Sequence, residues 1–293
     1  SFYPPLPVWL ALCGCSREHL HLFGGEDLGE EGVREACELG GVSVDWVDIA
    51  HASPSYLLDD ATYLPLLAKA REGGYDSAWA AFPCKAFCHS RWKEDGGAPP
   101  MYSCEHARGI PGLEGRWQVE LLDNEELLYR TCTLLGAVAE GGGSIAGETP
   151  VCRREPGWPW SREDRPHHMF LFEHPLWEAL EKGWGLKHAT FAQCHGLVGG
   201  DYQKYTVVSY SKGWASTWEE LDGCWCTCSV KHVAVAEGYS AEGISLASLA
   251  ERYPGLLRKR LSSGIIGLST GSAAGAEKGG EGGAAALGQG ASD

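Results

Sequence analysis

The sequence lacks several features that would place it in a broad class at once. It has no run of about 18 apolar residues, so no membrane-spanning helix is expected. Neither a basic flank nor a cleavage pattern marks a signal peptide, and no internal repeat is found. We therefore expect a soluble intracellular protein without a membrane partner, nuclear if its source is eukaryotic. A start at Ser1 rather than Met is expected of a fragment or a processed product.

Basic residues are also scarce. The chain has 24 Lys and Arg residues against 39 Asp and Glu residues, and its net charge of −15 argues against broad nonspecific binding of nucleic acid. The basic residues that are present gather in three groups, at 85–93, 153–168 and 258–260. Such groups form either a local positive groove or scattered, solvated charges.

What the chain does have is enough apolar sequence for a full core, and many cysteines. Its 293 residues are 44% hydrophobic, which suits one large globular domain. Twelve cysteines in a chain without an export signal favour thiols or metal ligands over a disulfide framework. Aromatic residues crowd the C-terminal half, where tryptophans either fill the core or stack on bases.

Predicted strands and helices alternate along the chain. Strands are expected at 19–23, 42–47, 75–81, 144–147, 187–192 and 205–210, and helices at 30–39, 63–72, 120–140, 175–182 and 246–261. This alternation predicts an α/β fold: a Rossmann-like, mostly parallel sheet with helices on both faces, plus a smaller C-terminal extension.

The chain divides into four expected parts. Residues 1–17 form an N-terminal extension and 18–148 the Rossmann-like core. Residues 149–262 complete the core and supply a region that faces substrate, and they include a long loop at 149–168. The tail, 263–293, is rich in Gly and Ala and is expected to be disordered.

Cys84 is the first candidate for chemistry. It follows an apolar run, Ser77 to Ala81, and a rigid Pro83, which predicts a thiol just beyond the carboxyl end of a buried strand. Ligands of open α/β sheets bind at that edge. Cys84 is therefore either a nucleophile or a packed thiol, and Cys88 is a rival nucleophile without a preceding proline.

Glycines and acidic residues indicate a cofactor site at the same edge. Phe23-Gly24-Gly25 ends the first strand, and such a turn lets a cofactor approach the backbone closely. Asp45 follows about twenty residues later, where a ribose-binding carboxylate is found in dinucleotide folds, although a solvated strand aspartate fits equally well. Asp59 and Asp60 are read as helix caps or as contacts to an adenine amino group.

A cysteine-rich segment forms a separate constellation. Cys224, Cys226 and Cys228 alternate along a predicted strand and so share one face, with His232 nearby. Three thiols and an imidazole are suitable zinc ligands. The alternative is a sheet face filled by small side chains.

Taken in order, these motifs resemble the cytosine-5 DNA methyltransferase family, and most closely its divergent members in phages and retroelement polyproteins. The resemblance covers roughly residues 18–262. Its motifs are Phe23-Gly24-Gly25, Asp45, Asp60, Pro83-Cys84, Glu148-Thr149-Pro150 and Gln203-Lys204-Tyr205-Thr206. The segments 172–177 and 190–194 are also similar to segments of these divergent domains.

The resemblance implies a complete site. Cys84 is then the nucleophile, Glu148 binds the edge of a cytosine flipped out of duplex DNA, and Gln203 and Lys204 belong to a later catalytic motif. The cofactor is S-adenosylmethionine. The residues that would line its site are Phe23, Gly24, Gly25, Asp45, Asp60 and Pro83.

Other hypotheses stay open. Lys85 and Thr149 stand where the family has glutamine and asparagine, and these departures also fit a catalytically degenerate domain of a mobile-element polyprotein that binds nucleic acid or protein. Glu148 is alternatively an ordinary strand carboxylate paired with Arg153 or Arg154, and Glu173 is a rival for its role. A third hypothesis is a zinc-stabilised module in which Cys84 is structural.

Overall fold

The protein is described by a computed structural model. Its described residues are 18–23, 32–47, 57–92, 97–152, 154, 161, 166–200, 202, 204–229, 232 and 253–275. None of the helices in these ranges combines the length and the apolar character needed to cross a bilayer.

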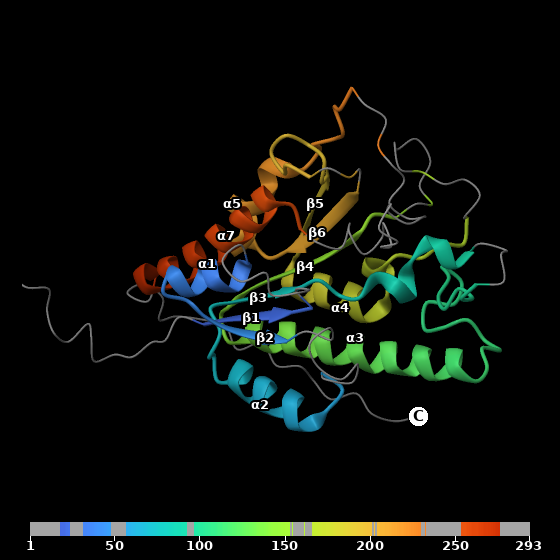
Figure 1. Ribbon diagram of the computed structural model, residues 1–293. Helices are drawn as coiled ribbons and strands as arrows, with labels where there is room; N and C mark the ends of the chain where they lie inside the picture. The colour runs from blue at the N-terminus through green and yellow to red at the C-terminus, as the bar shows by residue number, and fades with distance from the viewer. Residues whose placement is uncertain are drawn as a thin grey trace, which may run out of the picture.

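Six strands form one sheet in the order β2-β1-β3-β4-β6-β5 (Figure 1). The first four strands in the chain pair in parallel, whereas β6 runs antiparallel to both of its neighbours, β4 and β5. The sheet is therefore mostly parallel, as predicted. The strands are β1 (Glu18–Leu22), β2 (Ser43–Val47), β3 (Ser77–Ala80), β4 (Ser144–Pro150), β5 (Lys187–Ala192) and β6 (Tyr205–Tyr210).

Helices cover both faces of this sheet, which confirms the predicted α/β architecture (Figure 1). One face carries α2 (Asp60–Arg71), α3 (Arg116–Glu140) and α4 (Pro175–Trp184) over a core that includes Leu20 and Leu22. The other carries α1 (Val33–Leu39), α5 (Ala215–Trp218) and α7 (Gly255–Gly275) over a core that includes Trp79 and Trp214. Successive residues of a strand point to opposite faces, so each buried strand contributes to both cores.

Glycine ends two of the helices as the sequence predicts. Gly40 is the C-cap of α1, and the next residue, Gly41, has a φ of 77°. Gly73 follows α2 with a φ of 73°. Residues with a Cβ rarely adopt such positive φ angles, so glycine at these sites lets the chain turn directly into the next strand.

The C-terminal tail departs from its prediction. Helix α7 continues to Gly275, and the side chains of Leu261 and Ile265 are fully buried where it packs on α1 and α5. The expectation of disorder from residue 263 is thus wrong up to residue 275, because burial of one apolar stripe outweighs the weak helix propensity of the glycines and serines. Residues 276–293 lie outside the described residues.

Three tryptophans of the C-terminal half pack in the core. Trp177, Trp214 and Trp218 are fully buried, and Trp218 stacks on Trp79 with 5.2 Å between ring centroids. These three side chains are therefore not available to stack on bases. Trp158 and Trp160 lie outside the described residues.

Candidate functional site

Cys84 lies just beyond the carboxyl end of β3, as the sequence predicts. The strand ends at Ala80, and Cys84 opens a short 3-10 helix, η3 (Cys84–Phe87), directly after Pro83. Ala86 and Phe87 anchor this helix in the core, whereas Cys84 is only half-buried. The thiol is thus held by a packed turn and stays reachable from the edge of the sheet.

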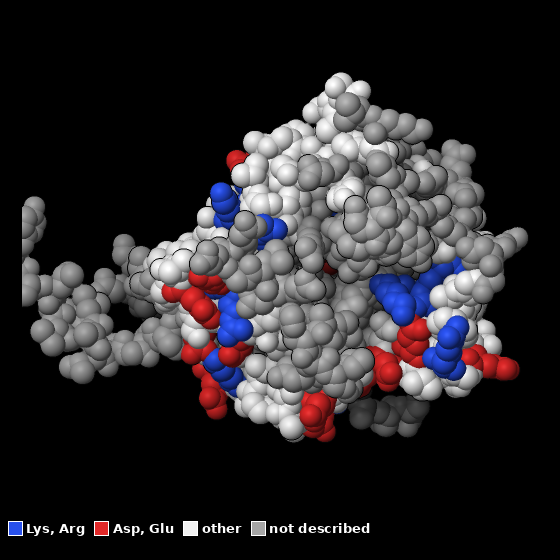
Figure 2. Space-filling model, viewed as in Figure 1, with Lys and Arg blue, Asp and Glu red and all other residues white. Residues whose placement is uncertain are grey.

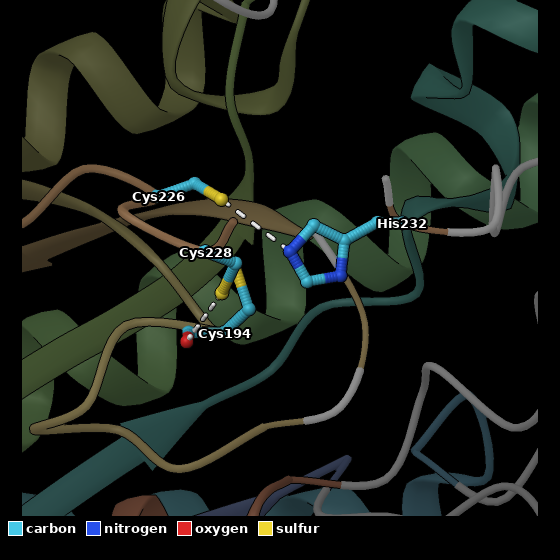
Figure 3. Close-up of side chains that lie close together, drawn as sticks. All are labelled: Cys194, Cys226, Cys228 and His232. Atoms are coloured by element: carbon cyan, nitrogen blue, oxygen red, sulfur yellow. Dashed lines mark hydrogen bonds between the residues drawn. The ribbon is translucent and has the colours of Figure 1, made fainter. Parts of the chain in front are cut away.

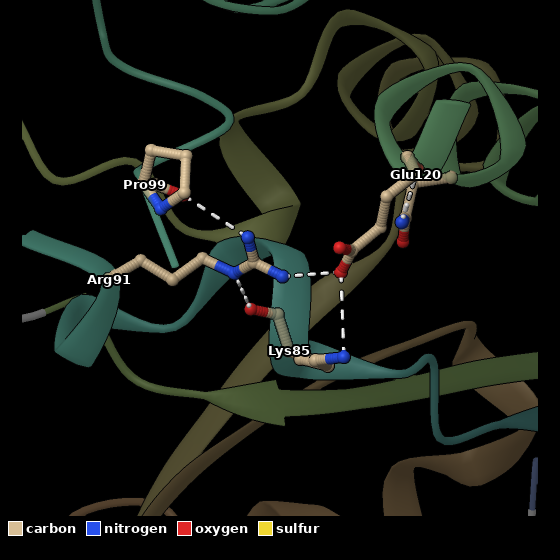
Figure 4. Close-up of polar contacts among 5 residues, drawn as sticks. Lys85, Arg91, Pro99 and Glu120 are labelled. Carbon is tan, nitrogen blue, oxygen red and sulfur yellow. Dashed lines mark hydrogen bonds and ion pairs between the residues drawn. The ribbon is translucent and has the colours of Figure 1, made fainter. Parts of the chain in front are cut away.

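Arg91 fixes the segment that follows Cys84 (Figure 4). Its buried guanidinium donates to the backbone oxygens of Lys85 and Pro99, at 2.7 and 3.1 Å, and forms an ion pair with Glu120 on α3. Lys85 also points to Glu120, at 3.6 Å, with a largely exposed side chain. Glu120 thus pairs with both cations.

Replacement of Arg91 tests this role. Arg91→Ala removes donors from two carbonyl oxygens and one carboxylate, so we expect the free energy of unfolding to fall by about 2 kcal/mol. Lys85→Ala is the matched control, because an exposed pair to the same carboxylate contributes less than about 1 kcal/mol. Urea denaturation of both variants measures the difference. Equal losses would contradict the assignment.

Glu148 lies inside β4 rather than after it. The sequence predicts a strand that ends at Gly147, but pairing with β6 extends β4 to Pro150 and places Glu148 opposite Val208. The prediction of the strand end was wrong because the extension depends on β6, which is distant in sequence. The side chain is 6% exposed and faces the side of the sheet that carries Tyr253.

Three side chains hold the Glu148 carboxylate. The Thr206 hydroxyl donates to Oε1 and the Tyr253 hydroxyl to Oε2, each at 3.2 Å. Lys204 Nζ lies 3.5 Å from Oε1. The Gln193 amide in turn donates to Thr206 Oγ1 at 3.0 Å. This ordered chain of donors fixes the position of the carboxylate in a largely dry environment.

Tyr253 is the residue of this cluster that sequence reasoning missed. Its side chain is buried, and burial, followed by the charge of Glu148, raises the pKa of its hydroxyl well above the usual value. It therefore stays protonated and acts as a donor. No local motif marks it, because it lies 105 residues from Glu148.

Cys84 and Glu148 belong to neighbouring strands of the sheet. Ala80, the last residue of β3, pairs with Gly147 of β4, directly before Glu148, and Cys84 follows Ala80 by four residues. The Tyr253 hydroxyl lies on the same carboxylate, 3.2 Å from Glu148 Oε2. Lys204 pairs with Glu148, and Gln203 lies outside the described residues.

Cys88 and Glu173, the alternatives to Cys84 and Glu148, contact other residues. Cys88 Sγ lies 3.0 Å from the Ser90 hydroxyl, between two short 3-10 helices. Glu173 pairs with Arg154 and accepts a hydrogen bond from the Phe170 amide at 3.3 Å. Glu173 is therefore a capping residue, and Arg154 binds it rather than Glu148.

The β1 end of the site carries a strained turn. Phe23 has a φ of 62°, a conformation that is uncommon for residues other than glycine. Its amide donates to Val47 at 2.7 Å, and its ring meets that of Phe82, two residues before Cys84, at 5.7 Å. This turn thus lies beside the turn that leads to Cys84. Gly24 and Gly25 lie outside the described residues.

The two aspartates predicted to bind the cofactor are engaged elsewhere. Asp45 lies within β2, two residues before its end, and its Oδ2 accepts from Lys69 at 2.7 Å and from Tyr75 at 2.6 Å. Asp60 pairs with Arg130 at 2.8 Å. We do not assign either residue to S-adenosylmethionine. Asp59 caps α2, as one reading of the sequence predicts.

The metal-ligand set differs from the predicted one by one residue. Cys226, Cys228 and His232 cluster with Cys194, and one ligand atom of each lies within 4.8 Å of all the others (Figure 3). Cys224 is not part of this cluster, because its thiol turns to the backbone oxygen of Glu220 at 3.4 Å. The segment 224–229 is irregular rather than a strand, so the alternation of its cysteines does not determine which of them meet.

The thiols of this cluster differ in acidity. Burial, together with the neighbouring Cys226 and Cys228, raises the pKa of Cys194 to about 12. Burial also acts to raise the pKa of Cys226, but hydrogen bonds from the Cys228 backbone, Cys194 and His232 outweigh it and lower the pKa to about 7.

In the described part of the chain, several residues of the three basic groups are paired with carboxylates. Arg91, Arg154 and Arg260 each form an ion pair with a carboxylate. On the face drawn in Figure 2, basic and acidic side chains lie next to one another. A groove of about 570 Å³ runs between α5 and α7 and includes Lys259, but Cys84, Glu148 and Tyr253 do not line it.

Comparison of the chain with protein-family models, with curated proteins and with solved structures gives no match.

Proposed function

We propose that the protein is an S-adenosylmethionine-dependent DNA (cytosine-5) methyltransferase-like protein. The observation that carries the proposal is a triply held Glu148 on β4, the strand that pairs with β3, which leads to Cys84. The antiparallel β6, placed between β4 and β5 in an otherwise parallel sheet, is also typical of Rossmann-like methyltransferases.

Cys84 would act as the nucleophile. Its thiolate adds to C6 of cytosine, which makes C5 nucleophilic and divides one difficult step into two easier ones. S-adenosylmethionine, when bound, supplies the methyl group. Loss of the C5 proton then expels the thiolate and restores the aromatic ring. The packed turn after Pro83 holds the thiol in place for this attack.

Glu148 would bind the cytosine edge. A carboxylate oxygen accepts about two hydrogen bonds, so Oε2 can accept from the cytosine amino group as well as from Tyr253. Thr206 and Lys204 keep the other oxygen in place. The target base reaches such a buried group only when it is flipped out of the duplex.

Trapping of the covalent adduct tests the proposal. Duplex DNA with 5-fluorocytosine at varied positions is incubated with the protein and S-adenosylmethionine. Fluorine at C5 cannot leave as a proton does, so we expect a complex that survives denaturation and is detected by mass spectrometry. The same duplexes with ordinary cytosine are the control. Absence of an adduct on every sequence, with no cofactor binding in calorimetry, would contradict the proposal.

A second candidate is a catalytically degenerate methylase-like domain that serves as an interaction module. It is favoured by Asp45, whose carboxylate is occupied by Lys69 and Tyr75. In that case the protein binds DNA or a protein partner without binding S-adenosylmethionine. Calorimetry with the cofactor alone separates the two candidates.

A further inference from the structure

Cys194, Cys226, Cys228 and His232 are brought together from two separate parts of the chain. Cys194 lies two residues after the end of β5, whereas the other three follow the short 3-10 helix η7 (Glu219–Leu221). The two segments are joined by a hydrogen bond from the Ala192 amide to the Cys224 carbonyl at 2.9 Å. The cluster is therefore a product of the fold and not of sequence proximity alone.

We infer that these four residues form a structural zinc site. Three thiolates and one imidazole make a complete tetrahedral ligand set for Zn²⁺ and leave no position open for a substrate. Zinc–sulfur and zinc–nitrogen bonds of about 2.3 and 2.0 Å place neighbouring ligand atoms roughly 3.5–3.8 Å apart. Cys226 Sγ and His232 Nε2 are 3.4 Å apart, and the whole set fits within 4.8 Å (Figure 3).

Ligand type favours zinc over other ions. Thiolates with an imidazole select zinc among the common divalent cations, whereas magnesium and calcium prefer oxygen ligands. The cluster also reaches the surface, because Cys194 is buried while Cys228 is exposed. A metal ion can therefore enter after the chain has folded.

The zinc site would hold in place residues that contact Glu148, without being part of the proposed catalytic cluster. Cys194 follows Gln193 directly, and Gln193 donates to Thr206, which donates to Glu148. The backbone N–H of Gln193 also donates to the backbone carbonyl of Lys204 at 2.8 Å. A zinc ion at Cys194 thus fixes the turn that orients Thr206 and Lys204 on Glu148.

Zinc content tests the inference. Purified under reducing conditions with zinc present, the full chain is expected to carry about one zinc ion, measured by mass spectrometry of the metal. Cobalt substitution should give the absorption of a tetrahedral thiolate site. Loss of a residue that is only hydrogen-bonded to a metal ligand lowers metal affinity by roughly 10–100-fold. Cys194→Ser and Cys228→Ser each remove a ligand itself, so their zinc affinity should fall by more than that. Cys224→Ser is the matched control and should keep its zinc.

Several results would overturn the inference. They are a zinc-free wild-type protein, zinc retained by both Cys194→Ser and Cys228→Ser, or a Cys194–Cys226 disulfide in the freshly purified protein. Because Cys228 is exposed, its variant is expected to fold even if Cys194→Ser does not. Zinc binding is measured without any methyl-transfer assay, so the result stands whether or not the proposed function holds.

Discussion

Cys84→Ser is expected to abolish the adduct with 5-fluorocytosine DNA, with a loss of at least about 10³-fold in methyl transfer. A serine hydroxyl is a far weaker nucleophile than a thiolate at neutral pH, and the cysteine is the group that bonds the base. Gel separation of denatured complexes measures the adduct, and transfer of a labelled methyl group measures turnover.

Cys88→Ser is the matched control for this variant. Cys88 lies four residues further along and is also half-buried, but its thiol faces Ser90. Its replacement should leave adduct and turnover near the wild-type level. If Cys84→Ser still forms the adduct while Cys88→Ser does not, the nucleophile is Cys88 and the assignment of Cys84 is refuted.

The second large effect is a loss of stability in mild acid. His19 and His21 of β1 are fully buried, and burial lowers the pKa of His19 to about 3 and that of His21 well below its usual value. His19 bonds the Ser77 hydroxyl at 2.8 Å, and His21 stacks on Trp46. Neither ring can take up a proton in the folded state near neutral pH.

The unfolded chain does take up these protons as the pH falls below about 6.5. Because the unfolded state then binds more protons than the folded state, stability decreases with falling pH, by about 1.4 kcal/mol per pH unit for each histidine. For His19 alone the loss reaches roughly 2 kcal/mol at pH 5 and continues towards pH 3.

Urea denaturation between pH 7 and pH 5 measures this slope. His19→Asn should reduce the slope by the contribution of one histidine, whatever its stability at pH 7. His106→Asn is the control, because His106 is exposed. A wild-type stability that stays constant from pH 7 to pH 5 would be incompatible with two buried, neutral histidines.

The sequence predicts the elements of this fold better than their arrangement. Gly41 and Gly73 mark real helix ends, and the apolar run before Pro83 is a buried strand, because local patterning and turn chemistry determine both. The insertion of β6 between β4 and β5 has no local signal. The same long-range pairing accounts for the strand end that was misplaced before Glu148.

The residues of the candidate site also differ in whether the sequence alone reveals them. Cys84, Glu148 and Lys204 belong to sequence motifs; Lys204 lies 3.5 Å from Glu148, and the strand that leads to Cys84 pairs with the strand that carries Glu148. Tyr253 and Cys194 become visible only when distant segments meet in space. Asp45 had the right spacing for a ribose contact, but spacing does not show that Lys69 and Tyr75 compete for its carboxylate.

The position of β6 has a consequence for the order of folding. In the sheet, β5 pairs with β6 alone, so the two strands can form a hairpin before either meets β4. Local pairing closes a short loop at low entropic cost, whereas docking on β4 spans far more of the chain. Thr206 lies in β6 of this hairpin, and Gln193 and Lys204 lie in the connection between its two strands. Docking of the hairpin on β4 therefore brings Thr206 and Lys204 to Glu148 together, whereas Tyr253 arrives with the segment before α7.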